Sequence, residues 1–67
     1  MHLRLIIDVT YDPNGVTQEE LAERLDSIPR LAAGEGLFTG ETEAEVESWN
    51  SHVLLVIDPI GATKRLK

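Results

Sequence analysis

The chain contains no cysteine. This absence excludes disulfide bonds, thiolate nucleophiles and zinc–thiolate centres, and with them the usual supports of a very small domain. The 67 residues have room for one domain. A domain of this size buries only about 60% of the surface that its unfolded chain exposes. Association with a partner or with a second copy is therefore the remaining means of stabilisation.

Aromatic and basic residues are also scarce. Three of the six basic residues lie in the last four positions, so residues 1–63 carry three basic against twelve acidic side chains, a net charge of −9. Such a field repels phosphates and attracts basic protein surfaces. The basic stripe and stacking aromatics of nucleic-acid-binding modules are missing as well, since Tyr11, Phe38 and Trp49 are the only aromatics. We expect a protein partner with a basic surface and no direct binding of nucleic acid by the folded body.

Long apolar runs are missing too. Residues 1–7 contain a basic residue and an apolar run, but Asp8 ends that run, which is too short for the apolar region of a secretory signal. No other stretch approaches the roughly 20 apolar residues that span a bilayer. We therefore expect a cytoplasmic protein that does not insert into a membrane.

Recognisable catalytic and ligand-binding motifs are absent. Neither His2 nor His52 has a Ser, Asp or Cys at a spacing that suggests a catalytic triad. There is no Walker loop, and the Gly34-x-Gly36 pair follows the predicted helix instead of opening one. We predict no enzyme, no catalytic residue, no cofactor and no metal ion. A small carboxylate-based metal-dependent enzyme remains an alternative that would need the fold to gather several acids.

The first regular pattern is an alternation over residues 3–11, which is typical of a half-buried strand. Ile6 alone breaks it, as an apolar residue on the polar face, and is either a scattered surface residue or part of a subunit contact. The sequence Asp12-Pro13-Asn14-Gly15 then predicts a turn. The predicted apolar face of the strand consists of Leu3, Leu5, Ile7, Val9 and Tyr11.

A helix is predicted to begin after Thr17, because Thr17 suits the N-cap and Glu20 completes a capping box three residues later. Apolar residues follow at spacings of four, three and four, which favours one face packed on a sheet. Gly34 fits the left-handed position after the helix end. The stripe consists of Leu21, Leu25, Ile28 and Ala32, widened by Ala22 and Leu31.

Pro29 complicates this helix because it lacks the N–H that the carbonyl of Leu25 would accept from. One kinked helix over residues 18–33 is favoured, since the apolar stripe continues in phase beyond the proline. A break after Ser27 is the alternative. The apolar patch between Gly36 and Gly40 is expected to pack against the helix end.

Four glutamates then alternate with smaller residues. On a strand they share one face, about 7 Å apart, where they must be solvated or neutralised by a partner. The pattern fits a solvated face that discourages edge-to-edge aggregation, or a docking strip for a basic surface. This acidic strip consists of Glu41, Glu43, Glu45 and Glu47.

The alternating apolar residues change from even to odd positions near residues 50 and 51. A hairpin that pairs Trp49 with His52 would place the apolar residues of both segments on one face, and it would add two strands to the sheet. One long bulged strand is the alternative, and a dimer would then complete the sheet. We therefore predict an α+β fold: a single βαββ domain over residues 1–61, with one kinked amphipathic helix packed on a three-stranded sheet. Residues 62–67 are predicted to be a disordered basic tail.

Two motifs carry a resemblance to a known group of proteins. DxNGVxxEEL at residues 12–21 and GLxTGxTxAEV at residues 36–46 resemble small uncharacterised bacterial proteins of phages, plasmids and other mobile elements. The resemblance covers roughly residues 8–50, and Pro29 departs from the layout of that group. It implies a mobile-element accessory protein and transfers no activity and no site residue.

These observations favour a non-enzymatic acidic protein-interaction module. Its partner-binding residues would be Glu41, Glu43, Glu45 and Glu47 with Trp49 as the apolar anchor, and its partner a basic, nucleic-acid-binding protein that it inhibits. The second hypothesis is a structural homodimer, in which an exposed strand edge pairs across a two-fold axis.

Overall fold

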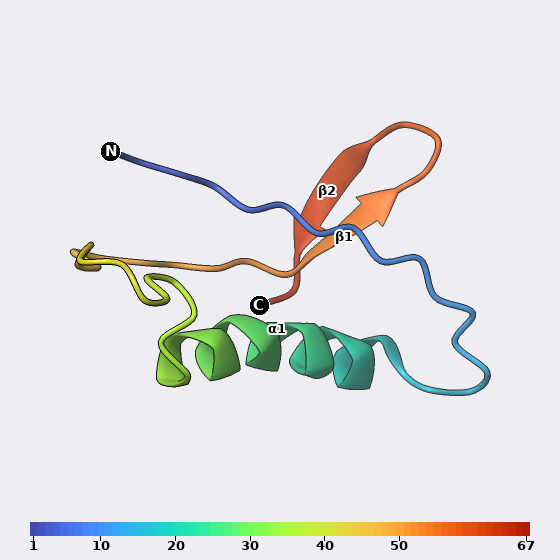
Figure 1. The fold of residues 1–67 in the computed structure, drawn as a ribbon. Helices are drawn as coiled ribbons and strands as arrows, with labels where there is room; N and C mark the ends of the chain where they lie inside the picture. The colour runs from blue at the N-terminus through green and yellow to red at the C-terminus, as the bar shows by residue number, and fades with distance from the viewer.

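The computed structural model describes all residues, 1–67, and contains one helix and one two-stranded antiparallel sheet (Figure 1). The helix is α1 (Gln18–Gly34), and the strands are β1 (Leu54–Ile57) and β2 (Ala62–Arg65). The α+β class is therefore confirmed. The elements follow in the order αββ, so the structure lacks the third strand of the predicted sheet.

Helix α1 begins as the sequence predicts. Thr17 is the N-cap with extended backbone, and its hydroxyl oxygen accepts a hydrogen bond from the N–H of Glu20 at 3.2 Å. Glu19 and Glu20 add negative charge to the first turn, where the helix dipole favours it. The helix continues through Pro29 without a break, so the alternative of a break after Ser27 is wrong. It lacks the length and apolar character needed to cross a membrane.

The end of α1 differs from the prediction by two residues. Gly34 is still helical, and the left-handed residue is Gly36, with φ of 69°. The N–H of Gly36 donates to the carbonyl of Ala33 at 3.1 Å, and the N–H of Leu37 donates to that of Ala32 at 2.9 Å. This pair of bonds is a Schellman motif, which satisfies two of the last helical carbonyls and reverses the chain.

The hairpin lies further along the chain than predicted. β1 pairs with β2 in a register that joins Leu54 to Arg65 and Ile57 to Ala62, so the predicted pairing of Trp49 with His52 is wrong. The prediction of a disordered tail over residues 62–67 is wrong as well. The turn over residues 58–61, with a cis bond before Pro59, brings the two strands together after only a short loop. Short loops cost little closure entropy.

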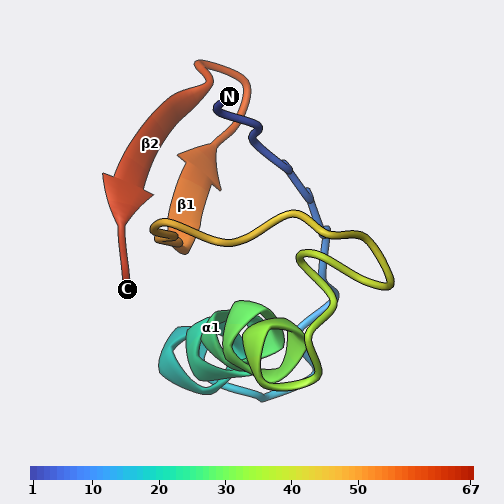
Figure 2. The ribbon, with the colours of Figure 1, turned by 60° about the vertical axis from the view of Figure 1, so that its left-hand side comes forward.

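Residues 3–11 are extended but are not a strand (Figures 1 and 2). No backbone hydrogen bond between main-chain groups involves residues 1–12. The physical reason is loop closure, because pairing with β1 would order the whole connection from residue 12 to residue 53. Alternation shows which side chains share a face, but a strand also needs a hydrogen-bonded neighbour.

The helix and the sheet approach each other only loosely, and every residue of both strands is exposed, in contrast to the closely packed layers of the prediction. No helical Cα lies within 8 Å of a Cα in either strand. The chain end reaches the start of the helix instead, where the Lys67 ammonium lies 3.9 Å from the Glu23 carboxylate. Only Ala22 and Val53 are buried. Within the expected apolar stripe of α1, Ile28 and Leu31 are exposed.

The molecule is therefore open. Its accessible surface is 6401 Å², whereas a compact monomer of 7.4 kDa exposes about 4,200 Å². Its radius of gyration is 14.4 Å, whereas a compact chain of this length has about 11 Å. The excess surface is about 2,200 Å², and much of it belongs to apolar side chains that have no partner within the chain.

The helix end gives a direct test of the left-handed cap. Gly36→Ala is expected to destabilise the protein by about 1 kcal/mol, because an L-residue is strained at positive φ. Gly34→Ala is the matched control and is expected to stabilise by about 0.5–1 kcal/mol, because Gly34 is helical and a Cβ there meets nothing within 4 Å. Urea unfolding followed by circular dichroism measures both. Equal effects of the two substitutions would contradict this cap assignment.

Candidate partner-binding site

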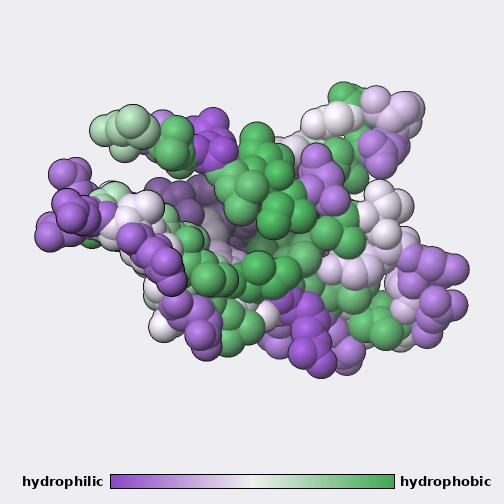
Figure 3. Space-filling view, viewed as in Figure 1, coloured by the Kyte–Doolittle hydropathy of each residue, from purple (hydrophilic) through white to green (hydrophobic).

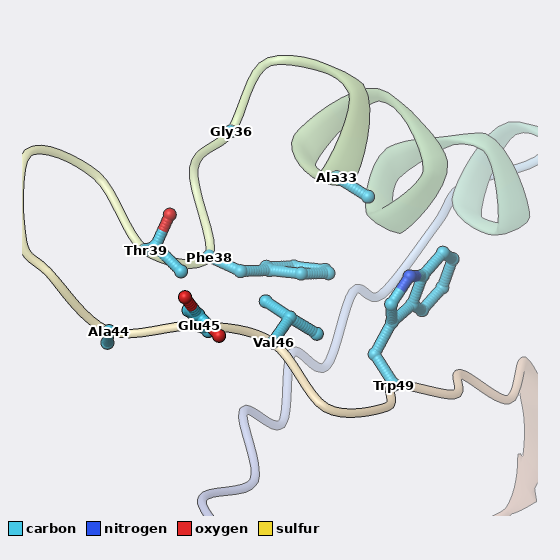
Figure 4. A pocket seen from close by; sticks show the side chains of 8 residues that line it. All are labelled: Ala33, Gly36, Phe38, Thr39, Ala44, Glu45, Val46 and Trp49. Atoms are coloured by element: carbon cyan, nitrogen blue, oxygen red, sulfur yellow. The ribbon is translucent and has the colours of Figure 1, made fainter.

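An open hollow of about 360 Å³ lies beside the C-terminal end of α1. The side chains of Phe38, Val46 and Trp49 point toward one another in it, with Ala33 of the helix above them (Figure 4). Thr39, Ala44 and Glu45 lie at its other end. The lining is thus apolar in its centre and polar at one side. The complete lining is Ala33, Gly36, Phe38, Thr39, Ala44, Glu45, Val46 and Trp49.

The reversal after α1 builds one wall of this hollow. Gly36 turns the chain back, and the N–H of Gly40 donates to the Gly36 carbonyl at 2.9 Å, which closes a second turn. Phe38 lies inside the second turn, and Figure 4 shows its ring beneath Ala33. The expectation that the patch from Gly36 to Gly40 packs against the helix end fits this arrangement.

Phe38 and Trp49 form the central contact of the hollow. Their ring centroids are 5.6 Å apart and their planes lie at 67°, an edge-to-face geometry. Aromatic rings favour this geometry because the positive edge of one ring meets the negative face of the other. Nearly half of each side chain is nevertheless exposed, 46% for Phe38 and 45% for Trp49. The pair is ordered within the chain and still presents apolar surface outward.

The four glutamates of the acidic strip are all exposed, but they do not lie on a strand as predicted. Turns and bends cover residues 41–43. The Thr42 hydroxyl donates to the carbonyl of Thr39 at 2.6 Å and accepts from the N–H of Ala44 at 3.3 Å. Such local bonds compete with strand pairing, and Glu, Ala and Gly have low strand preference. The strip is therefore an acidic loop that leads into the hollow through Glu45 and Val46.

No basic group neutralises this loop. The ion pairs of the structure join Arg30 to Asp26 at 3.4 Å and Lys67 to Glu23 at 3.9 Å, and neither involves the strip. Residues 31–63 contain six carboxylates and no Lys or Arg. Figure 3 shows hydrophobic side chains in the middle of one face and hydrophilic ones over the projecting loop at its left. The glutamates of the acidic strip therefore take part in no ion pair within the chain.

Of the five residues predicted to bind a partner, Glu45 and Trp49 line the hollow, whereas Phe38 and Val46 line it and were not predicted. The available signal was the apolar patch between Gly36 and Gly40, yet nothing in its spacing relates it to Trp49. No three Asp, Glu or His side chains come together in a way that could hold a metal ion.

Comparison with known proteins gives no family: no family model, no curated protein and no solved structure matches the chain.

The aromatic contact can be tested through Trp49, which is the only tryptophan. Phe38→Ala is expected to shift Trp49 emission to longer wavelength and to increase quenching by acrylamide, because the ring loses its apolar neighbour. The lost pair would cost about 0.5–1.5 kcal/mol of stability. Leu37→Ala is the control, since Leu37 is 68% exposed and does not line the hollow. The same spectrum for both variants would refute the contact.

Proposed function

We propose that the chain is a non-enzymatic interaction module that docks on a basic protein through the acidic loop and the hollow around Trp49. The observation that carries this proposal is that Glu45, one of four exposed glutamates without an ion pair, lines the same hollow as a half-exposed aromatic pair. Glu45 belongs to both features, because it is one of the four glutamates of the acidic strip and it also lines the hollow, next to Val46. Charge and apolar surface therefore form one continuous patch.

The two parts of this patch have different physical roles. The acidic loop, together with the negative body, attracts a basic surface over several ångströms and speeds its encounter. Charges exposed to water add little net affinity. The affinity would come from burial of the aromatic pair, since tryptophan in a desolvated pocket is a typical binding anchor. Trp49 and Phe38 are suited to this role because their contact already restricts their side chains.

A basic surface of the required kind is common on proteins that bind nucleic acids. The chain would occupy such a surface and so act as an inhibitor or decoy. The resemblance of residues 12–21 and 36–46 to mobile-element proteins supports this class of role, as an accessory protein directed at a host factor in the cytoplasm.

The proposal predicts salt-sensitive capture of a basic protein from host lysate. Docking should weaken steeply with salt, because the screening length falls from about 10 Å at 0.1 M to about 3 Å at 1 M. Trp49→Ala should reduce retention of that protein at least about tenfold, the loss expected for an anchor worth more than 1.4 kcal/mol. Retention is measured on the immobilised chain, followed by titration of the purified partner.

The matched control separates the loop from the net charge. Glu43→Gln/Glu45→Gln and Glu19→Gln/Glu23→Gln both change the net charge from −6 to −4, but only the first pair lies in the acidic strip. The first variant should lose retention and the second should keep most of it. Recovery of no basic protein at low salt, or equal losses in the two double variants, would overturn the proposal.

A further inference from the structure

We propose that residues 3–9 form an intermolecular antiparallel strand pair with the same residues of a second copy, about a two-fold axis at Ile6. The partner strand is a second copy of the chain because the segment is complementary to itself. This dimer does not depend on the docking function proposed above.

The backbone of the segment is free to pair. Residues 3–9 are already extended, and none of their main-chain groups takes part in a backbone hydrogen bond (Figures 1 and 2). Their apolar side chains are exposed, with an exposed fraction that falls from 83% at Leu3 to 47% at Val9. An extended apolar segment with open main-chain groups is a template for pairing with another chain.

The charges of the segment select one register. Arg4 and Asp8 are its only charged residues, and they lie symmetrically on either side of Ile6. An antiparallel pair centred on Ile6 therefore places each Arg4 opposite the Asp8 of the other copy, twice in the dimer. The same register pairs Leu3 with Val9 and Leu5 with Ile7 on the opposite face. Opposite charges and matched apolar residues are the favourable cross-strand pairs.

Other registers are worse. Moving the axis to Leu5 places Arg4 opposite Ile6, and moving it to Ile7 places Asp8 opposite Ile6. If the two-fold axis passed between two residues, the apolar side chains of one strand would lie on the same face as the polar side chains of the other strand. A parallel, in-register pair would oppose Arg4 to Arg4 and Asp8 to Asp8. The two-fold antiparallel pair at Ile6 is thus the one that satisfies both faces. It also gives Ile6, the exception to the alternation, a position at the centre of an interface.

The open monomer supplies the area that a dimer needs. Each copy exposes about 2,200 Å² more than a compact chain of its mass. A stable interface typically buries about 1,200–2,000 Å² in total over both partners. Strand pairing of residues 3–9 would bury part of this excess, and neighbouring exposed apolar side chains can add to the interface. The pairing segment is also electrically neutral, because Arg4 and Asp8 are its only charged residues, so it adds no net repulsion between the two copies.

Charge reversal tests the register. Analytical ultracentrifugation of the whole chain should give about twice the 7.4 kDa monomer mass. Arg4→Glu and Asp8→Arg should each weaken dimerisation by about 10- to 100-fold, because two like-charge pairs replace two opposite pairs. An equimolar mixture of the two variants should recover the dimer, because the introduced glutamate then faces the introduced arginine and the unchanged Asp8 faces the unchanged Arg4. Recovery on mixing also shows that both variants are competent to pair.

The two variants separate local pairing from overall repulsion. Arg4→Glu makes the chain more negative and Asp8→Arg makes it less negative, so an effect of net charge alone would be opposite in sign for the two. Strictly monomeric wild-type protein up to millimolar concentration would overturn the proposal. So would a mixture that remains as monomeric as its components.

A cysteine cross-link locates the axis independently. The natural chain has no cysteine, so Ile6→Cys would introduce a single thiol. Residues opposite each other in an antiparallel pair have Cα atoms about 4.5–5.5 Å apart, within the range for a disulfide. Thr10→Cys is the control on the same face, because its two copies would lie about 27 Å apart. Rapid oxidation to a covalent dimer is expected for Ile6→Cys alone. Equal rates for both variants would exclude this register.

Discussion

The small amount of buried surface is the constraint on which the rest of this structure depends. Only Ala22 and Val53 are buried, and no disulfide or metal site compensates. The regular elements are therefore those whose backbone hydrogen bonds form between residues close in sequence. They are a helix with caps at both ends and a hairpin with a short turn. Segments that need distant partners remain extended. The same constraint leaves apolar side chains at the surface, and contiguous exposed patches of this kind are typical of interaction sites.

The accuracy of sequence-based prediction follows this division between local and distant interactions. Thr17 as N-cap and a helix that continues beyond Pro29 were predictable, because capping chemistry and apolar periodicity act within a few residues. The position of the left-handed glycine was wrong by two residues. Gly34 and Gly36 are both compatible with a helix end, and the choice between them depends on which carbonyls accept the last hydrogen bonds.

Strand pairing was predicted less well, for a physical reason. Alternation identified residues 3–11 as strand-like, but it carries no information on which edge they join. Pairing between Ala62–Arg65 and β1 closes only a short turn, whereas pairing of residues 3–11 with β1 would close the whole connection from residue 12 to residue 53. For the candidate site, composition identified the glutamates and Trp49. The contact between Phe38 and Trp49 could not be predicted from the sequence, because it depends on the chain reversal at Gly36. The position of that reversal was itself predicted wrongly.

The two surfaces proposed for this chain are distinguished by charge, and this allows them to coexist. The acidic loop would act by long-range attraction, so salt weakens its docking. In a dimer of two acidic chains the long-range term is repulsive, and salt reduces it while the short cross-strand contacts remain. Moderate salt should therefore favour the strand pair while it weakens the docking. If both surfaces operate, a dimer presents two copies of the hollow around Trp49. A partner with two basic sites would then gain affinity through effective concentration, provided that the dimer geometry allows both hollows to engage at once.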